Sequence, residues 1–556
     1  MAAVTTDGLY ATHEVTNQPP ALEAYNAYEQ DTVLVEALHR EGASWAEEKA
    51  RQLGRVVGSE RMFTLARLAN KHSPELRTHD RLGNRIDFVE FHPAYHELIA
   101  LAFGAEVHSL AWTARRSGAH TARAVLSYLW NLGENGIGCP TGMAYAAIPA
   151  LRHQKEMAAE WEPRILSTEY DPRLLPITQK KGVTIGMAMT EKQGGSDLRA
   201  NTTRAQAIGS GGPGGEYYLT GHKWFCSAPM SDGFLTLAHT GKPSVLSCFL
   251  VPRWLPDGTR NRFFIQRLKD KLGNRSNASS EIEYHQTWAR MVGEEGRGIA
   301  TILEMVHLTR IDFAVSSAAI MRQALTQALH HAINRRAFQR VLAEQPLMKN
   351  VLADLALEAE AAAVLTLRLA RAFDESEKDE SQRLLSRIGT PVAKYWICKR
   401  TPVFVAEALE CLGGNGFVEE SIMPRLYREA PLNGIWEGTG NVICLDVVRA
   451  MVREPKAVPA FMAQIEDARG ADRRLDAFVE ALTRELADRN DVEGRARRVT
   501  EMMALAFQGA LLVQYSPPSV ADAFCASRLA GDWGRAFGTL PQGLAYDEII
   551  KRTGLD

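Results

Sequence analysis

The order of helical and β-prone segments is the feature that most constrains the fold of this chain. From about residue 20 to 180, leucine, alanine and charged residues recur at helical spacing, as in 33-VLVEALHREGASWAEEKARQL-53. Between about 182 and 292 the pattern changes to short β-prone runs, such as 216-EYYLTGHKWF-225 and 245-VLSCFLVP-252, separated by Gly, Pro, Asn and Ser. This middle stretch is typical of a small β domain.

Helical patterns return in the second half of the chain. They fill about 296–450, with an acidic, helix-breaking interruption at 374-DESEKDESQ-382, and a helical remainder follows. Because helices and strands do not alternate as βαβ units, we do not expect a doubly wound parallel sheet. We predict a mainly α protein with a central β domain, in four parts: a helical N-terminal domain, the β domain, a helical bundle and a helical C-terminal extension, at residues 1–181, 182–292, 293–450 and 451–556.

Charge and composition narrow the functional classes. The 64 Lys and Arg residues nearly balance the 66 Asp and Glu residues, so net charge alone implies neither a nucleic acid nor an anionic membrane as partner. The first residues lack a basic segment followed by an apolar run, and no apolar stretch reaches the roughly 18 to 20 residues of a membrane span. We expect a cytoplasmic protein without a membrane association. The seven cysteines lack CxxC spacing, so we expect no metal site and no disulfides, and interpret them as small buried residues.

Two glycine-rich segments invite a cofactor interpretation, and only one supports it. The segment 209-GSGGPGG-215 has G-x-G-x-x-G spacing, but a proline and a following β-prone run predict a hairpin loop instead of a dinucleotide-binding turn. In 187-MAMTEKQGGSD-197 a β-prone run gives way to Gly194, Gly195 and Ser196. Amide groups unobstructed by Cβ, together with hydroxyls, could hold an anionic or carbonyl-rich ligand, although an ordinary turn is the simpler interpretation of this segment taken alone.

Six motifs follow one another across nearly the whole chain: MAMTEKQGGSD (187–197), TGHKWFCSA (220–228), KLGNRSNASSEIEY (271–284), RRAF (335–338), LGGNGF (412–417) and IWEGTG (435–440). In this order they resemble the acyl-CoA dehydrogenase family of flavoenzymes. The lysine in TEKQGGSD, the phrase LGNRSNAS, the segment 139-CPTGMAYAAIPAL-151 and the extra C-terminal hundred residues are similar to the AidB-like branch, which is associated with the response to DNA alkylation. The resemblance implies an α domain, a β domain and a four-helix-bundle α domain, with FAD as cofactor.

The resemblance implies that Glu437 is the catalytic base. Family members remove a proton from Cα of an acyl thioester and pass a hydride from Cβ to the flavin. Cα–H is too weak an acid for water to deprotonate, so a positioned carboxylate is required, and burial beside Trp436 would raise its pKa toward neutrality. The alternative is a glutamate that stabilises the helix beginning near Thr439 or Asn441.

The resemblance also implies the residues that hold FAD: Met189, Thr190, Ser196, Phe225, Ser227, Arg335, Phe338, Trp436, Thr439 and Asn441. In the family, the residues matching Arg335 and Phe338 come from a neighbouring subunit, so a dimer-based oligomer, a homotetramer, is implied. Phe225 could instead belong to a strand core, and Thr439 and Asn441 could be helix caps. One departure is that Glu410 and Cys411 stand where a flavin-contacting glutamine is typical, which leaves that adenine-side contact in doubt.

Two functions remain open at this point. The first is an FAD-dependent flavoprotein that slowly dehydrogenates a short or branched, isovaleryl-CoA-like acyl-CoA and takes part in the DNA alkylation response by binding duplex DNA. The second is an ordinary metabolic acyl-CoA dehydrogenase without a DNA role. Arg310 matches a family arginine near the CoA chain, although an ion-paired structural arginine would fit the same position.

The evidence for DNA lies in the arginines of the C-terminal part. Residues 451–556 contain 14 Lys and Arg against 16 Asp and Glu, so this extension is not basic overall. Arg449 is the leading candidate for a DNA contact. Further arginines could share a face with it, or could instead lie on a solvated helix surface with i,i+4 ion pairs: Arg453, Arg484, Arg489, Arg495, Arg497 and Arg498.

Overall fold

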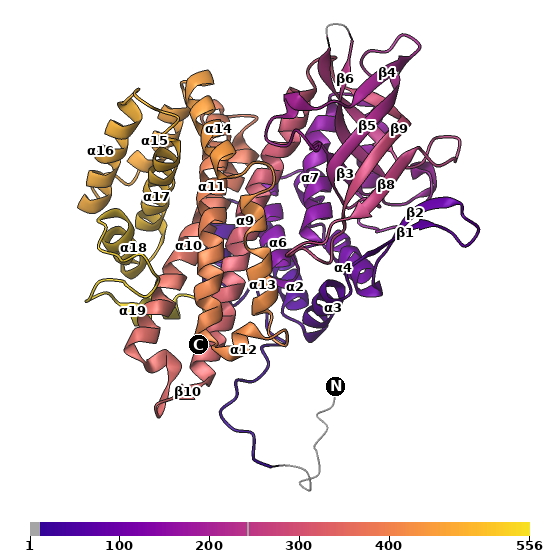
Figure 1. Ribbon diagram of the computed structural model, residues 1–556. Helices are drawn as coiled ribbons and strands as arrows, with labels where there is room; N and C mark the ends of the chain where they lie inside the picture. The colour runs from indigo at the N-terminus through magenta and orange to yellow at the C-terminus, as the bar shows by residue number, and fades with distance from the viewer. Residues whose placement is uncertain (1–11, 242–243, 556) are drawn as a thin grey trace.

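The computed structural model describes residues 12–241 and 244–555 and has the predicted order of a helical part, a β part and two further helical parts (Figure 1). The N-terminal helices are α1 (Thr32–Arg40), α2 (Glu47–Val57), α3 (Glu60–Lys71), α4 (Pro93–Gly104), α5 (Leu110–Thr113), α6 (Ala119–Gly133), α7 (Gly138–Arg152) and α8 (Lys155–Ile165). Nearly every residue of α6 and α7 is buried, which explains why these two helices lack a polar face.

A β-hairpin within this helical part was not predicted. Strands β1 (Glu75–His79) and β2 (Arg85–Glu90) pair antiparallel. The turn between them is organised by Asp80, whose Oδ1 accepts hydrogen bonds from the amides of Leu82 and Asn84, and Gly83 supplies a φ of +84°. The sequence 80-DRLGN-84 is typical of such a turn. The two strands are short and lie between segments with helical spacing, so the pattern around them predicts helix.

The β part is a closed sheet, formed by β3 (Ile185–Ala188), β4 (Arg204–Ile208), β5 (Glu216–Ser227), β6 (Gly233–Thr240), β7 (Val245–Pro252), β8 (Phe263–Leu268) and β9 (Ser279–Val292). The strand order is β3-β6-β4-β5-β9-β7, and β7 pairs with β6 as well as with β9, which closes the sheet into a barrel. Antiparallel pairing of β4 with β5 confirms that residues 209–215 form a hairpin loop.

Three long helices form the centre of the molecule: α9 (Gly298–Asn334), α10 (Pro346–Glu375) and α11 (Glu380–Cys411). The predicted acidic break separates α10 from α11. A small hairpin of β10 (Arg336–Ala337) and β11 (Arg340–Val341) follows α9. The bundle continues with α12 (Gly414–Phe417), α13 (Met423–Glu429) and α14 (Gly440–Arg453).

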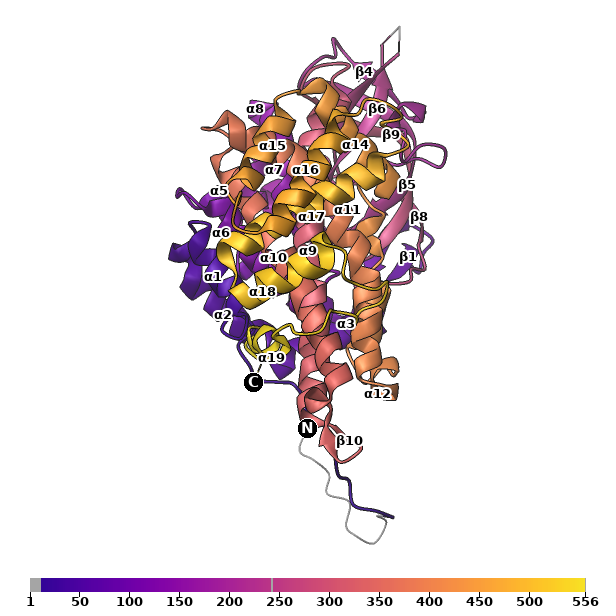
Figure 2. The same cartoon turned by 90° about the vertical axis from the view of Figure 1, so that its left-hand side faces the viewer.

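The C-terminal helices pack against the bundle on the side away from the barrel (Figures 1 and 2). They are α15 (Ala457–Glu466), α16 (Arg473–Ala487), α17 (Ala496–Tyr515), α18 (Pro518–Phe524), the π-helix η6 (Cys525–Leu529) and α19 (Tyr546–Lys551). A buried arginine joins them to α10, because Arg528 donates to Asp354 and, at 2.9 Å, to Glu358. None of the helices in the described ranges is long and apolar enough to cross a membrane.

Candidate active site

The loop before α14 holds Glu437 in an unusual conformation. Its φ is +52°, a left-handed value that costs a residue with a side chain on the order of 1 to 3 kcal/mol. Within the described residues, its half-buried carboxylate has no hydrogen bond or ion pair, so it does not cap α14. Burial raises the pKa of this carboxyl, whereas the charges of Arg310 and Lys394 lower it. A strained, unpaired carboxylate with a raised pKa is suited to general-base catalysis.

Cations hold the backbone of this loop. The Nε of Arg310 donates to the carbonyl of Glu437 at 3.0 Å, and its Nη1 donates to Asp446 at 2.8 Å. Lys394 of α11 donates to the carbonyl of Trp436 at 3.0 Å and also to that of Gly438. The Trp436 ring stacks on Phe313 of α9 with 4.6 Å between ring centroids. The loop is therefore fixed by both α9 and α11.

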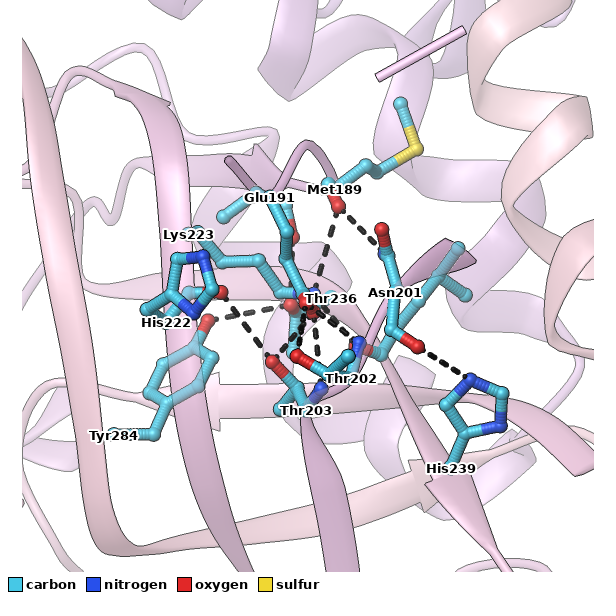
Figure 3. A network of polar contacts seen from close by, with 12 residues as sticks. Met189, Glu191, Asn201, Thr202, Thr203, His222, Lys223, Thr236, His239 and Tyr284 are labelled. Carbon is cyan, nitrogen blue, oxygen red and sulfur yellow. Dashed lines mark hydrogen bonds and ion pairs between the residues drawn. The ribbon is translucent and has the colours of Figure 1, made fainter. Parts of the chain in front are cut away.

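The loop that contains Met189, Thr190 and Ser196 is held at its base by a buried ion pair (Figure 3). Glu191 and Lys223 are both fully buried, with 2.9 Å between Oε1 and Nζ. The same carboxylate accepts hydrogen bonds from the amide and hydroxyl groups of Thr202 and Thr203. Both ends of the segment 191–203 are thus tied to one carboxylate.

The segment between these ends provides free donors. Ser196 is exposed, and within the described chain the amides of Gly195 and Ser196 have no protein acceptor. A Cβ on Gly195 would lie 3.1 Å from the Thr190 side chain, so a larger residue here would require this side chain to shift by a few tenths of an ångström. Donors that lack protein acceptors fit the pyrophosphate and carbonyl oxygens of FAD.

Strand β5 adds an aromatic surface beside this loop. The amide of Trp224 donates to the carbonyl of Thr190 at 2.7 Å, which joins the strand to the loop. The next ring, Phe225, is 52% exposed, so it is not a core residue, and Ser227 is half-buried two positions later. An exposed ring beside unengaged amide donors is the surface that a flavin requires.

The buried thiol of Cys139 lies close to these groups. Burial raises the pKa of Cys139 to about 11, while the charge of Lys271 and hydrogen bonds from Ser227 and Asn277 lower it and the charge of Glu437 raises it. All seven cysteines are buried, as predicted. The structure therefore brings segment 139–151, through Cys139, and the LGNRSNAS motif, through Asn277, together beside Ser227 and Glu437.

Arg335 and Phe338 lie far from the other predicted flavin residues of the same chain. They follow the end of α9, and 25 residues of helix separate Arg335 from Arg310, about 38 Å at 1.5 Å per residue. Phe338 is 92% exposed with a φ of +50°, and Arg335 Nη1 donates to the carbonyl of Asn17 at 2.5 Å. Glu410 is exposed near the end of α11, at the same end of the bundle as this hairpin (Figure 1).

The remaining predicted residues lie at the start and on the surface of α14. Thr439 occupies the N-cap position but makes no side-chain capping bond, and both Thr439 and Asn441 are exposed. The Arg449 side chain is 53% exposed, and its Nη1 is 3.3 Å from Asp446. Arg310 is 9% exposed and ion-paired, as the structural interpretation of this residue expects.

Arg310 also lines a cavity of about 600 Å³. This volume is within the usual range for small-molecule sites. The wall combines apolar side chains with four arginines; it includes Trp112, Arg116, Arg152, Leu303, Leu308, Arg310, Phe373, Asp374, Arg387 and Asp446. The cavity therefore reaches the arginine that binds the carbonyl of Glu437.

Comparisons with known proteins agree with this architecture. Residues 17–172 match the adaptive response protein AidB N-terminal domain, 186–287 the acyl-CoA dehydrogenase middle domain and 296–452 the acyl-CoA dehydrogenase C-terminal domain. The chain is 44% identical to the AidB protein of Escherichia coli strain K12 over 98% of its own length and 99% of that protein. It is 28% identical to acyl-CoA dehydrogenase family member 11 of Caenorhabditis elegans, over 89% and 85% of the two chains.

A solved structure provides the same relationship in three dimensions. The structure of Caenorhabditis elegans ACDH-11 in complex with C11-CoA covers 95% of each chain, with a TM-score of 0.84 and 26% identity. The family match, the barrel between helical domains and the flavin-compatible surface of β5 and its neighbouring loop lead to one assignment. The chain belongs to the AidB-like branch of the acyl-CoA dehydrogenase family, whose members are FAD-dependent oxidoreductases.

Proposed function

We propose that this protein dehydrogenates acyl-CoA thioesters, with Glu437 as the base that removes the Cα proton. The observation that carries the proposal is the conformation of Glu437: its carboxylate has no partner among the described residues, its backbone is in the left-handed region, and burial raises its pKa. A residue that served only to stabilise α14 would need neither the strain nor the burial. FAD, when bound, supplies the hydride acceptor.

The residues around Glu437 have separate tasks in this proposal. Thr190, Phe225 and Ser227 hold the flavin ring, and the amides of residues 195 and 196 hold its pyrophosphate. Arg335 and Phe338 act on the flavin of a neighbouring subunit, since about 38 Å of α9 separates them from the region of Arg310. The exposed Phe338 ring would be removed from water by contact with a neighbouring subunit, which agrees with this arrangement. The active form is then an oligomer, for which we propose a homotetramer in the cytoplasm.

The thioester enters through the cavity beside Arg310. The C11-CoA bound to the worm relative supports a CoA thioester as the ligand class. Arg116 lines the cavity and offers a guanidinium group to the phosphates of CoA, whereas Arg152 and Arg387, which also line it, are ion-paired with carboxylates. As the acyl group we propose a short or branched one, such as isovaleryl, placed beside Trp436, which packs against the buried cluster that contains Cys139 and Met143.

The test is anaerobic reduction of the FAD-loaded protein by a series of short and branched acyl-CoA compounds. Glu437→Gln is isosteric, so it should retain FAD and slow flavin reduction by on the order of 10²-fold or more. Glu466→Gln is a suitable control, because this exposed glutamate of α15 lies outside the cavity lining and, among the described residues, pairs with Arg469. Unchanged kinetics in Glu437→Gln would return this glutamate to a structural role.

A second function, binding of duplex DNA in the response to alkylation, is favoured by the arginines on the C-terminal side. Arg453, Arg484, Arg489 and Arg497 are exposed, and among the described residues none has a carboxylate within 4 Å. Helices α14, α16 and α17, which carry Arg453, Arg484 and Arg497, lie side by side, and Arg489 follows the end of α16 (Figure 2). Arg495 and Arg498 instead pair with Glu485, so they are weaker candidates.

Salt dependence separates this function from purely metabolic dehydrogenation. If Arg449 and its neighbours contact phosphates, log K for duplex DNA should fall linearly with log salt, with little sequence preference. Arg449→Ala should lower affinity by a similar factor on every sequence and leave FAD content unchanged. Arg77→Ala is the matched control, because Arg77 is also an exposed, ion-paired arginine but belongs to β1, away from the C-terminal helices (Figure 1). Binding that does not respond to salt, or no binding at low salt, would leave only the dehydrogenase function.

A further inference from the structure

Three consecutive backbone carbonyls around the proposed base are held by two buried cations. Lys394 donates to the carbonyls of Trp436 and Gly438, and Arg310 donates to the carbonyl of Glu437 between them. In an extended chain the carbonyls of residues i and i+2 point to one side and that of residue i+1 to the other, so Lys394 and Arg310 can hold this loop from two sides. Glu437, with its positive φ, lies between the two carbonyls that Lys394 holds.

Lys394 has no other evident role at this position. It lies in the interior of α11 and is 1% exposed, where an ammonium group is costly unless it is well solvated by the protein. In the described part of the chain no carboxylate lies within 4 Å of its Nζ, so the two loop carbonyls are its main partners. A lysine that stabilised only the bundle would be replaced by an apolar residue at lower cost.

We propose that Lys394 is a positioning residue that fixes the backbone of Glu437 and, by its charge, keeps the carboxylate of this base ionised. The proposal rests on the proposed function of Glu437 as the base. Arg310 cannot fulfil this role alone, because its guanidinium is shared between the carbonyl of Glu437 and the carboxylate of Asp446. Lys394 is the group that reaches both sides of the base.

The charges around Lys394 agree with this role. Burial, opposed by the Cys398 thiol and Glu437 and assisted by the charge of Arg310, lowers the pKa of Lys394 to about 8. The positive charge in turn lowers the pKa of Glu437, against the effect of burial. Loss of Lys394 should therefore raise the pKa of Glu437 and move the acid limb of flavin reduction to higher pH.

The experiment compares Lys394→Met and Lys394→Gln with Lys399→Met, an exposed lysine on the same helix. Lys394→Met should slow flavin reduction by on the order of 10²-fold at saturating acyl-CoA, with little change in ligand affinity, because the base is misplaced while the ligand site remains. Lys394→Gln, which keeps a donor without charge, should recover part of the rate but not the acid limb. Lys399→Met should behave as the wild type.

Amide hydrogen exchange of residues 433–441 provides a readout that does not depend on turnover. Exchange should accelerate in Lys394→Met and remain unchanged in Lys399→Met. Wild-type protein that no acyl-CoA reduces would refute the proposed function, while the exchange comparison would still decide the positioning role. Unchanged exchange in Lys394→Met, or loss of the fold in both Lys394 variants, would overturn the proposal and assign this lysine to the stability of the bundle.

Discussion

Replacement of Glu191 by Gln tests whether the buried ion pair at the base of the flavin loop holds that loop in place. In the structure the carboxylate accepts hydrogen bonds from Lys223, Gln193 and both the amide and hydroxyl groups of Thr202 and Thr203. A glutamine side chain would direct an NH₂ group at some of these donors. It would also leave the Lys223 ammonium, which is fully buried, without a counter-charge.

The pKa values of the two partners indicate the size of the effect. Burial raises the pKa of Glu191, but the Lys223 charge and the hydrogen bonds outweigh it and lower this pKa from 4.5 to about 2. The stabilisation, about 3 kcal/mol, is present above pH 4.5 and is lost as pH falls toward 2. Burial lowers the pKa of Lys223 from 10.5 to about 8, against the charge of Glu191 and its hydrogen bond, so the buried ammonium depends on this carboxylate as its counter-charge.

Removal of one partner is a different matter, because the other charge remains buried. We expect Glu191→Gln to lower the free energy of unfolding by about 3 to 5 kcal/mol and to weaken FAD binding. The double variant Glu191→Gln with Lys223→Met should lose about 1 to 3 kcal/mol less than the sum of the two single variants.

The assay is denaturant unfolding of the FAD-free protein, followed by titration with FAD. Glu169→Gln serves as the control, since its pair with Lys181 is exposed on both sides and should contribute less than about 1 kcal/mol. A loss below about 1 kcal/mol in Glu191→Gln, or full additivity in the double variant, would refute the reasoning.

Two further predictions concern the shared site and its titration. If Arg335 acts on the flavin of a neighbouring subunit, Arg335→Ala and Glu437→Gln should each be inactive alone. After the two variants are mixed and reassembled, half of the dimers contain one chain of each kind, and each of these has one complete site out of two, so about one quarter of wild-type activity should return. No recovery of activity would contradict a site built from two chains. Glu437 must be ionised to act and burial raises its pKa, so the rate constant of flavin reduction should fall with decreasing pH, with a midpoint above pH 4.5. A midpoint at or below pH 4.5 in stopped-flow measurements would show that the carboxyl is not buried during the reaction.

The sequence was sufficient for the fold class and for the family. Periodicity separated the helical parts from the β part, because side chains repeat every 3.6 residues in a helix and every second residue in a strand. The hairpin at residues 75–90 was missed, since its short strands are flanked by strong helical patterns. The motif around Glu437 and the loop at 187–197 could be located from the resemblance, because each is a continuous stretch of chain.

The tertiary structure alone decided which groups meet. Lys394, Arg310 and the carbonyl of Glu437 come from three separate segments, and nothing in the sequence around Lys394 indicates that its ammonium reaches the loop of the base. The same applies to Cys139, which is interpreted as a core residue in the sequence and lies beside Ser227 and Asn277 in the structure. Local patterns reflect interactions between residues near in the chain, whereas pKa shifts, buried ion pairs and backbone strain arise from contacts between distant segments, which exist only after the helices and the barrel have packed.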